Sequence, residues 1–277
     1  MQIPRRQLVL GGTGILIAAA AGNAEKPAAA AAAASAESLV QPPASVLVIG
    51  AGGATGGRIV RELLKRGYKV KAGVRDVEKG KAKLGAADGL SFVKTDVTEP
   101  ESVIAQAIGD AEAVIVATGK ASLNPADSWA VDNLGTQKAV DAAKKKGVKK
   151  FVLVSSILTN GAAIGQFFNP AYLVLNIIGG GVLFAKLKAE EHIKKAGVDY
   201  TVVRPGGLSN EPPAGSVVMG SEDTLFGGRI SRDLVALVAV EALVSKNASK
   251  KVVEVIESPD APLKSFEDMF AACKNAS

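Results

Sequence analysis

The hydrophobic positions of the chain follow two alternating patterns. Short continuous apolar runs, rich in β-branched residues, are typical of strands buried on both faces. Between these runs, apolar residues recur every three or four positions, which predicts amphipathic helices. Repeated strand and helix units with right-handed crossovers predict a Rossmann-type α/β fold, a doubly wound parallel sheet with helices on both faces. The expected strands lie at 46–49, 68–74, 90–93, 113–116, 151–154 and 200–203.

The expected helices support the same architecture. Three of them end at a glycine shortly before the next strand, and a further helix is expected at 101–108. Towards the C-terminus, Ser231 is expected to cap a helix that continues to Leu243. A strand at 252–256 and a last helix at 266–272 follow. The three terminating glycines are Gly67, Gly147 and Gly197.

Residues 1–43 do not share this pattern and are interpreted as a targeting segment followed by a linker. Arg5 and Arg6 precede an apolar stretch at 8–22, which is the arrangement of a twin-arginine export signal. The alanine-rich stretch and prolines that follow are typical of a linker. In a plastid, such a segment would resemble the thylakoid-directed part of a transit sequence, so a chloroplast address and twin-arginine export both stay open. The folded domain is expected to span 44–277.

Composition excludes several kinds of chemistry. The 277 residues include one cysteine, Cys273, and one histidine, His192, so we expect no disulfide framework, no metal site and no Ser-His-Asp triad. The formal net charge is +6, but aromatic residues make up only 4% of the chain. Because base stacking needs aromatic side chains among the basic ones, we expect no nucleic-acid partner.

A glycine-rich loop lies between the first expected strand and the helix after it. Gly50 permits the sharp turn, Gly53 lets the backbone approach a phosphate, and Gly56 lets the helix pack closely on the strand. Ala54 and Thr55 complete the loop, and Thr55 adds a hydroxyl. Because the first backbone N–H groups of the helix have no partner within it, the loop predicts a site for the pyrophosphate of a dinucleotide.

Residues after the next three strands are expected to complete this site. Arg75 stands where the residue that reads the adenosine ribose belongs, and an arginine there favours the 2′-phosphate of NADP(H). The other interpretation is that Arg75 only caps a loop beside Asp76. Asp96 and Val97 are expected near the adenine. The residues expected beside the ribose are Ala117, Thr118 and Gly119.

Together with these motifs, Ser155-Ser156 and Arg204-Pro-Gly206 make the chain resemble the atypical short-chain dehydrogenase/reductase group with NmrA-like and plastid members. More narrowly, the stretch 222–228 is similar to chloroplast proteins described as flavin-reductase-related, and to the dehydrogenase-like subunit of the inner-envelope translocon. The resemblance implies NADPH binding and association with thylakoids, plastoglobules or envelope. It also implies a small C-terminal substrate lobe interleaved with the Rossmann sheet.

The chain departs from the wider superfamily at the catalytic motif. Other branches carry Tyr-xxx-Lys, in which the tyrosine donates a proton and the lysine holds the nicotinamide ribose. Lys186 stands at the lysine position, and Val182 stands where the tyrosine would be. Lys186 and Ser155 are therefore the candidate catalytic residues. Carbonyl reduction without the acid would lose about two to four orders of magnitude in rate, whereas hydride transfer to a flavin or quinone does not need it.

These observations favour an NADPH-dependent reductase of an apolar or aromatic acceptor, such as a quinone, a flavin or a prenyl-type lipid. The alternative is a catalytically weak NADPH-dependent redox sensor or scaffold on a plastid membrane complex. An apolar, glycine-containing insertion at 162–185 fits three roles: internal packing with a pocket wall, contact with lipid or plastoglobules, or oligomerisation.

Overall fold

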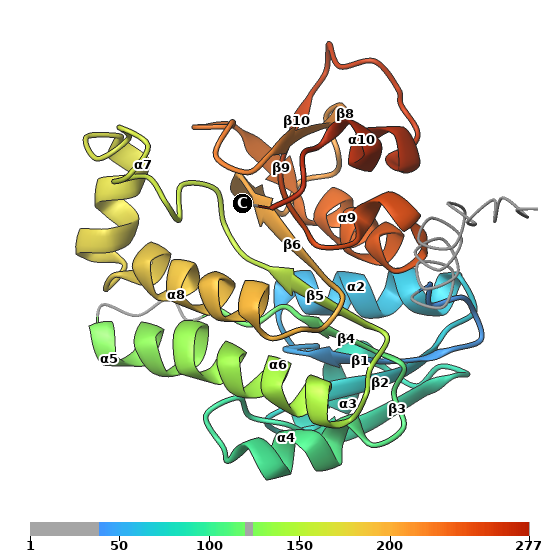
Figure 1. The fold of residues 1–277 in the computed structure, drawn as a ribbon. Coiled ribbons are helices and arrows are strands. Elements are labelled where there is room, and N and C mark those ends of the chain that lie inside the picture. The colour runs from blue at the N-terminus through green and yellow to red at the C-terminus, as the bar shows by residue number, and fades with distance from the viewer. Residues whose placement is uncertain (1–38, 120–123, 277) are drawn as a thin grey trace, which may run out of the picture.

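The computed structural model describes residues 39–119 and 124–276. The expected targeting segment therefore lies largely outside the described residues. A single eight-stranded sheet forms the centre of the molecule, in the order β3-β2-β1-β4-β5-β6-β10-β8 (Figure 1). Every neighbouring pair is parallel except β8 with β10. The predicted Rossmann-type fold is confirmed.

The sheet strands are β1 (Ser45–Ile49), β2 (Lys69–Val74), β3 (Leu90–Lys94), β4 (Ala113–Val116), β5 (Lys150–Val154), β6 (Tyr200–Pro205), β8 (Ser216–Ser221) and β10 (Lys251–Ser258). A separate parallel pair consists of β7 (Gly207–Ser209) and β9 (Arg229–Ser231). The longer helices are α2 (Ala54–Lys65), α3 (Val77–Leu84), α4 (Glu101–Ile108), α6 (Thr136–Lys145), α8 (Val182–Lys195), α9 (Arg232–Val244) and α10 (Phe266–Ala272).

Alternate residues of the central strand β1 enter two different cores. Val46 and Val48 pack in the cluster that α2, α9 and α10 cover, whereas Leu47 and Ile49 pack in the cluster under α4, α6 and α8. Because successive side chains of a strand point to opposite faces, a run without polar residues is buried on both sides. This is why the apolar runs of the sequence mark the strands.

The C-terminal elements extend the sheet and form the small lobe beside it. The Ser231 hydroxyl accepts a hydrogen bond from the backbone N–H of Asp233 at 3.3 Å and so caps α9, as predicted. β10 pairs with β6 on one side and with β8 on the other. The lobe thus shares the sheet with the dinucleotide-binding half.

Two connections contain short helices of unusual form. Between β4 and α6 the chain forms α5 (Pro125–Ser128) and the π-helix η1 (Trp129–Gly135). Between β5 and α8 it forms α7 (Pro170–Leu173) and the π-helix η2 (Val174–Ile178). Among the described residues we find no single helix that is long and apolar enough to cross a bilayer. The pair 170–178 and 182–195 passes the length and composition test together, with a bend of 92°.

Candidate functional site

The glycine loop forms a tight cradle where β1 ends. Gly50 has a φ of +86°, and a Cβ there would lie 2.8 Å from the Ala117 carbonyl oxygen. A Cβ on Gly56 would overlap the carbonyl oxygen of Gly50. Gly53 stands at the N-cap of α2, and no described side chain makes a capping hydrogen bond there. The helix therefore presents free backbone N–H groups, as a pyrophosphate site requires.

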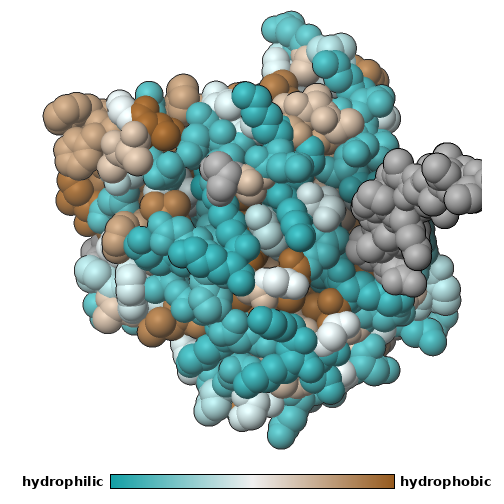
Figure 2. Space-filling model, in the orientation of Figure 1, coloured by the Kyte–Doolittle hydropathy of each residue, from teal (hydrophilic) through white to brown (hydrophobic). Residues whose placement is uncertain are grey.

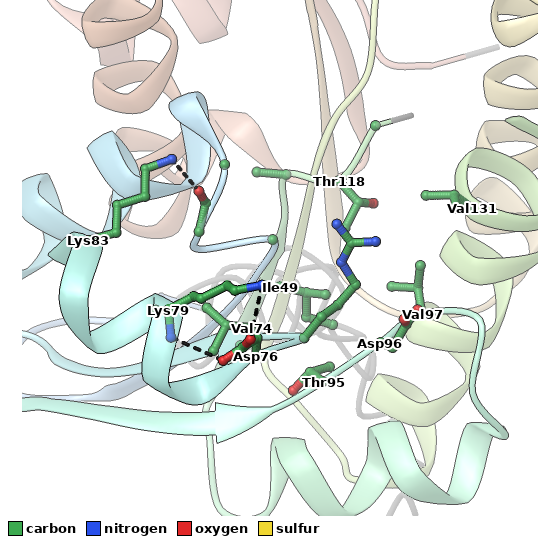
Figure 3. Close-up of a pocket in the computed structure, with 18 residues that line it drawn as sticks. Ile49, Val74, Asp76, Lys79, Lys83, Thr95, Asp96, Val97, Thr118 and Val131 are labelled. Carbon is green, nitrogen blue, oxygen red and sulfur yellow. Dashed lines mark hydrogen bonds and ion pairs between the residues drawn. The ribbon is translucent and has the colours of Figure 1, made fainter. Parts of the chain in front are cut away.

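A cavity of about 370 Å³ opens at the carboxyl ends of the first four strands (Figure 3). Eight of the predicted cofactor residues line it, whereas Ala54, Thr55, Gly56 and Lys186 do not. Gly56 instead packs closely against the Gly50 carbonyl group, which leaves no room for a Cβ at this position. The predicted lining residues are Gly50, Gly53, Arg75, Asp96, Val97, Ala117, Thr118 and Gly119.

Two buried hydroxyls in the cavity wall fit a polar ligand. Thr95 and Thr118 each line the cavity, and neither Oγ1 atom has a hydrogen-bond partner within the described ranges. A buried hydroxyl without a partner costs free energy of the order of 1–3 kcal/mol. A ligand oxygen within hydrogen-bond distance of either hydroxyl would give it a partner, so the wall fits a polar ligand such as a nucleotide.

The end of the cavity beside α3 is basic. Arg75 follows β2 and is exposed, and Lys79 and Lys83 line the same cavity from one face of α3. The Lys83 ammonium donates to the Gly52 carbonyl oxygen at 2.6 Å, which joins α3 to the glycine loop. Asp76 caps α3 by accepting from the Lys79 backbone N–H at 3.0 Å, and this hydrogen bond lowers the pKa of the Asp76 carboxyl. Figure 3 shows both lysines turned towards these partners.

Sequence reasoning did not find Lys79 and Lys83. Their spacing of four residues is the available signal, since residues four apart share one helix face. That signal has meaning only once a helix is recognised at 77–84.

Lys186 lies beside the cavity and not in its wall. Its ammonium is 2.8 Å from Asp132 Oδ1, and the lysine side chain is 13% exposed while the aspartate is fully buried. Asp132 belongs to the π-helix η1, and a Cβ on Gly119 would lie 3.7 Å from its Oδ1. π-Helical turns occur often at functional sites. The pair therefore adjoins the part of the cavity that follows β4.

Ser155 does not line the cavity. Its hydroxyl donates to Glu190, which is fully buried and also accepts from the Arg204 guanidinium at 2.6 Å. Three more carboxylates lie within 3.3 Å of Arg204, and they belong to Glu222, Asp223 and Glu254. Burial alone would lower the pKa of Arg204, but the carboxylates, led by Glu190, raise it. Burial raises the pKa of Glu254.

Val182 is the first residue of α8 and packs against the small cluster of Ile157, Leu158 and Leu183. Tyr172 packs in the same cluster, and its ring lies against Gly161. His192 is half-buried and lies 2.8 Å from Asp141. The position of the superfamily's tyrosine is thus occupied by a packed aliphatic side chain.

Comparisons with known proteins agree with this geometry. A family profile described as NAD(P)H-binding matches residues 50–246. An uncharacterized chloroplastic protein of Arabidopsis thaliana, At2g34460, is 57% identical over 83% of this chain and 82% of its own length. Protein TIC 62 of Pisum sativum, labelled chloroplastic, is 38% identical over 81% of this chain, which spans only 45% of that protein.

Two further proteins are similar at lower identity. Sanguinarine reductase of Eschscholzia californica is 27% identical over 82% of this chain and 95% of its own length. The solved structure of the oxidoreductase ylbE from Lactococcus lactis superposes with a TM-score of 0.70 at 22% identity, over 82% of this chain and 95% of that one. At this identity the structure shows the shared fold alone.

Proposed function

Because the chain belongs to the NAD(P)H-binding family, we propose that it is an NADPH-dependent reductase that transfers hydride to an apolar or aromatic acceptor. The observation that carries the proposal is the cavity at the strand ends, with its glycine cradle and two unpartnered threonine hydroxyls. When bound there, the nicotinamide supplies the hydride. The protein's own residues bind the dinucleotide and orient it.

Lys186 and Ser155 remain the proposed polar residues of the reaction site. Lys186 has the more direct support, because its pairing with buried Asp132 fixes the ammonium near the end of β4. Ser155 has less support, because it does not line the cavity and its hydroxyl donates to Glu190. Val182 has no proton to donate, so an acceptor that takes its proton from water suits the site better than an ordinary carbonyl.

NADPH is proposed over NADH because of the basic end of the cavity. The cavity wall contains three basic side chains and two carboxylates, and its net positive charge favours a 2′-phosphate. The basic residues are Arg75, Lys79 and Lys83, and the acidic ones are Asp76 and Asp96. The Asp76 carboxyl is engaged by Lys79, through its backbone N–H and through its ammonium at 3.5 Å.

A chloroplast setting is proposed from the relatives labelled chloroplastic. The second candidate function, a redox sensor or scaffold on a plastid membrane complex, is favoured by Val182 at the position of the proton donor. Under that proposal NADPH binds to the same cavity and no acceptor is turned over. Peripheral membrane or plastoglobule contact through 162–185 is compatible with both functions.

One experiment separates the two functions. NADPH fluorescence is followed on binding to the full chain, and its oxidation is then followed as flavin and quinone acceptors are added in turn. Saturable binding with repeated turnover supports the reductase, and binding without oxidation by either acceptor class supports the sensor. Failure to bind NADPH refutes both.

A matched pair of variants tests the role of Lys186. Lys186→Ala should reduce acceptor-dependent oxidation at saturating NADPH, whereas Lys195→Ala, at an exposed lysine of the same helix, should not. Equal rates in the two variants would contradict a role of Lys186 in the reaction.

A further inference from the structure

An exposed apolar surface lies at one end of the molecule. We call residues 167–184 the apolar hairpin; it comprises α7, η2 and the first residues of α8. Phe168 is 82% exposed and Ile177 is 74% exposed, although both are large apolar side chains. Neighbouring apolar side chains with half or more of their surface exposed are Phe167, Val174, Ile178 and Phe184. A contiguous exposed patch of this kind marks a contact surface.

The apolar hairpin projects from the body of the protein. Figure 1 shows α7 at the far end of α8, beyond the sheet and its covering helices. The same corner is brown in the space-filling view, next to largely hydrophilic surface (Figure 2). Its inner side is held by Tyr172 and Leu183, which pack on Ile157 and Leu158. The surface is therefore a protrusion on a small base, and not a groove that would receive another chain.

The polar groups of the apolar hairpin are largely used within the fold. The Asn169 side chain accepts from the Ala171 backbone N–H at 3.0 Å and donates to the Phe226 carbonyl oxygen at 3.0 Å. The Asn176 side-chain oxygen accepts from the Phe184 backbone N–H at 3.3 Å. The sequence contains no charged residue from 162 to 185. The exposed tip therefore offers few hydrogen-bonding groups to a protein partner.

Amphipathic side chains stand at the base of the apolar hairpin. Trp129 is 40% exposed and stacks on Phe184, with ring centroids 6.0 Å apart. The Lys188 ammonium lies 5.6 Å from the centroid of the Phe184 ring. Tryptophan is enriched at the boundary between lipid and water, and lysine keeps its charge in water while its stem covers apolar surface. The side chains at the base are therefore suited to the headgroup region of a lipid layer.

We propose that the apolar hairpin inserts into the surface of a lipid layer. Its uncharged tip enters the acyl region, and Trp129 and Lys188 lie at headgroup level. The lipid contact would also give an acceptor a route to the reaction site, an inference that rests on the proposed function. Lys186 is two residues beyond Phe184, and its partner Asp132 lies beside the end of β4. An apolar acceptor dissolved in the lipid would therefore reach the reaction site along the base of the apolar hairpin.

The test uses Trp129, which is the single tryptophan of the sequence and lies at the base of the proposed contact. The full chain is mixed with vesicles of phosphatidylcholine and phosphatidylglycerol, prepared with and without brominated acyl chains. Tryptophan emission should shift to the blue and should be quenched by the brominated lipid. Because Trp129 is the source of the tryptophan emission, attachment through another part of the chain does not cause this quenching.

A matched pair of variants tests the tip. Phe168→Ser with Ile177→Ser should weaken vesicle partitioning by about tenfold or more for each side chain, because tenfold corresponds to about 1.4 kcal/mol and burying a large apolar side chain contributes at least that much. Leu263→Ser is the control, because Leu263 is 94% exposed but lies in the loop before α10. The control should partition like the unaltered chain. NADPH binding should be the same in all three proteins.

Three results would overturn the proposal. The first is sedimentation with vesicles without quenching of Trp129, which would mean that another segment attaches. The second is equal partitioning of the double variant and the Leu263 control. The third is a blue shift that depends on protein concentration without vesicles, which would mean that a second copy covers the surface. If quenching is observed but NADPH does not bind, the proposed function fails and the lipid contact stands.

Discussion

The ion pair between Lys186 and Asp132 should be energetically coupled, and a double-mutant cycle measures that coupling. Lys186 is 13% exposed and Asp132 is fully buried, with 2.8 Å between the ammonium nitrogen and Oδ1. Asp132→Asn removes the negative charge and retains the shape of the side chain. The lysine would then hold a charge in a poorly hydrated position without its carboxylate, and this state is costly.

The expected magnitude follows from the burial of the pair. Removing one partner of a buried ion pair costs about 3–5 kcal/mol of stability, and the partial exposure of Lys186 places this pair near 3 kcal/mol. For a domain of this size, this corresponds to a fall in Tm of roughly 6–12 °C. The variant Asp132→Asn with Lys186→Gln leaves no uncompensated charge. It should be destabilised by less than the sum of the two single variants.

Thermal and urea unfolding of the four proteins in the cycle provide the measurement, with NADPH-binding affinity as a second readout. Lys188 and Glu191 form an exposed pair, 2.8 Å apart, on the same helix, and are the control. Their cycle should give a coupling below about 1 kcal/mol. If the effects of the Asp132 and Lys186 variants simply add, the two side chains are independent, and the argument that Asp132 positions Lys186 is refuted.

Further measurements test other contacts. Arg75→Ala should weaken NADPH binding more than NADH binding, whereas Lys81→Ala, at a residue outside the cavity wall, should change neither; equal losses for the two cofactors would contradict the specificity argument. Burial raises the pKa of Tyr68 to about 12, so the stability due to its neutral hydroxyl is complete below pH ~10 and is lost as the pH rises towards 12. Tyr68→Phe should lose about 1 kcal/mol at neutral pH, because the hydroxyl donates to a backbone carbonyl at 2.8 Å, and should show less of this alkaline decline in urea unfolding. Ser155→Ala should lower the urea midpoint because Glu190 loses a buried donor, and a fall in turnover without a change in NADPH affinity would support a role in the reaction.

Much of the fold was predictable because its strands are buried on both faces. The strand at 113–116 and the helices at 101–108 and 266–272 were predicted with the bounds that the structure has. Several elements were missed, and β8 and α3 show the physical reasons. β8 is an antiparallel strand at the edge of the sheet, and most of its residues are only partly buried, so it has no continuous apolar run. α3 buries only Gly80, so the apolar period that identifies a helix is absent.

The site was predictable where it depends on the local chain and not where it depends on tertiary contacts. The turn at Gly50 and the residues after the strands followed from the order of strand, loop and helix. The pairing of Asp132 with Lys186 joins elements that are distant in sequence, and Asp132 lies in a π-helix that departs from the helical period of the sequence. Ser155 was correctly placed at the end of a strand, but its buried partner Glu190 comes from α8 and decides where its hydroxyl points.

The substitution at the superfamily's proton-donor position and the apolar hairpin have a common structural basis. Val182 begins α8 where the bend of the apolar hairpin ends, and it packs with Ile157, Leu158 and Leu183. Val182, at the position where the superfamily has its tyrosine, is therefore part of the packed base under the exposed apolar surface. A carbonyl substrate would meet no proton donor at this position. An acceptor that takes its proton from water does not need that donor, and the proposed function therefore names the quinone or flavin class instead of ordinary carbonyl compounds.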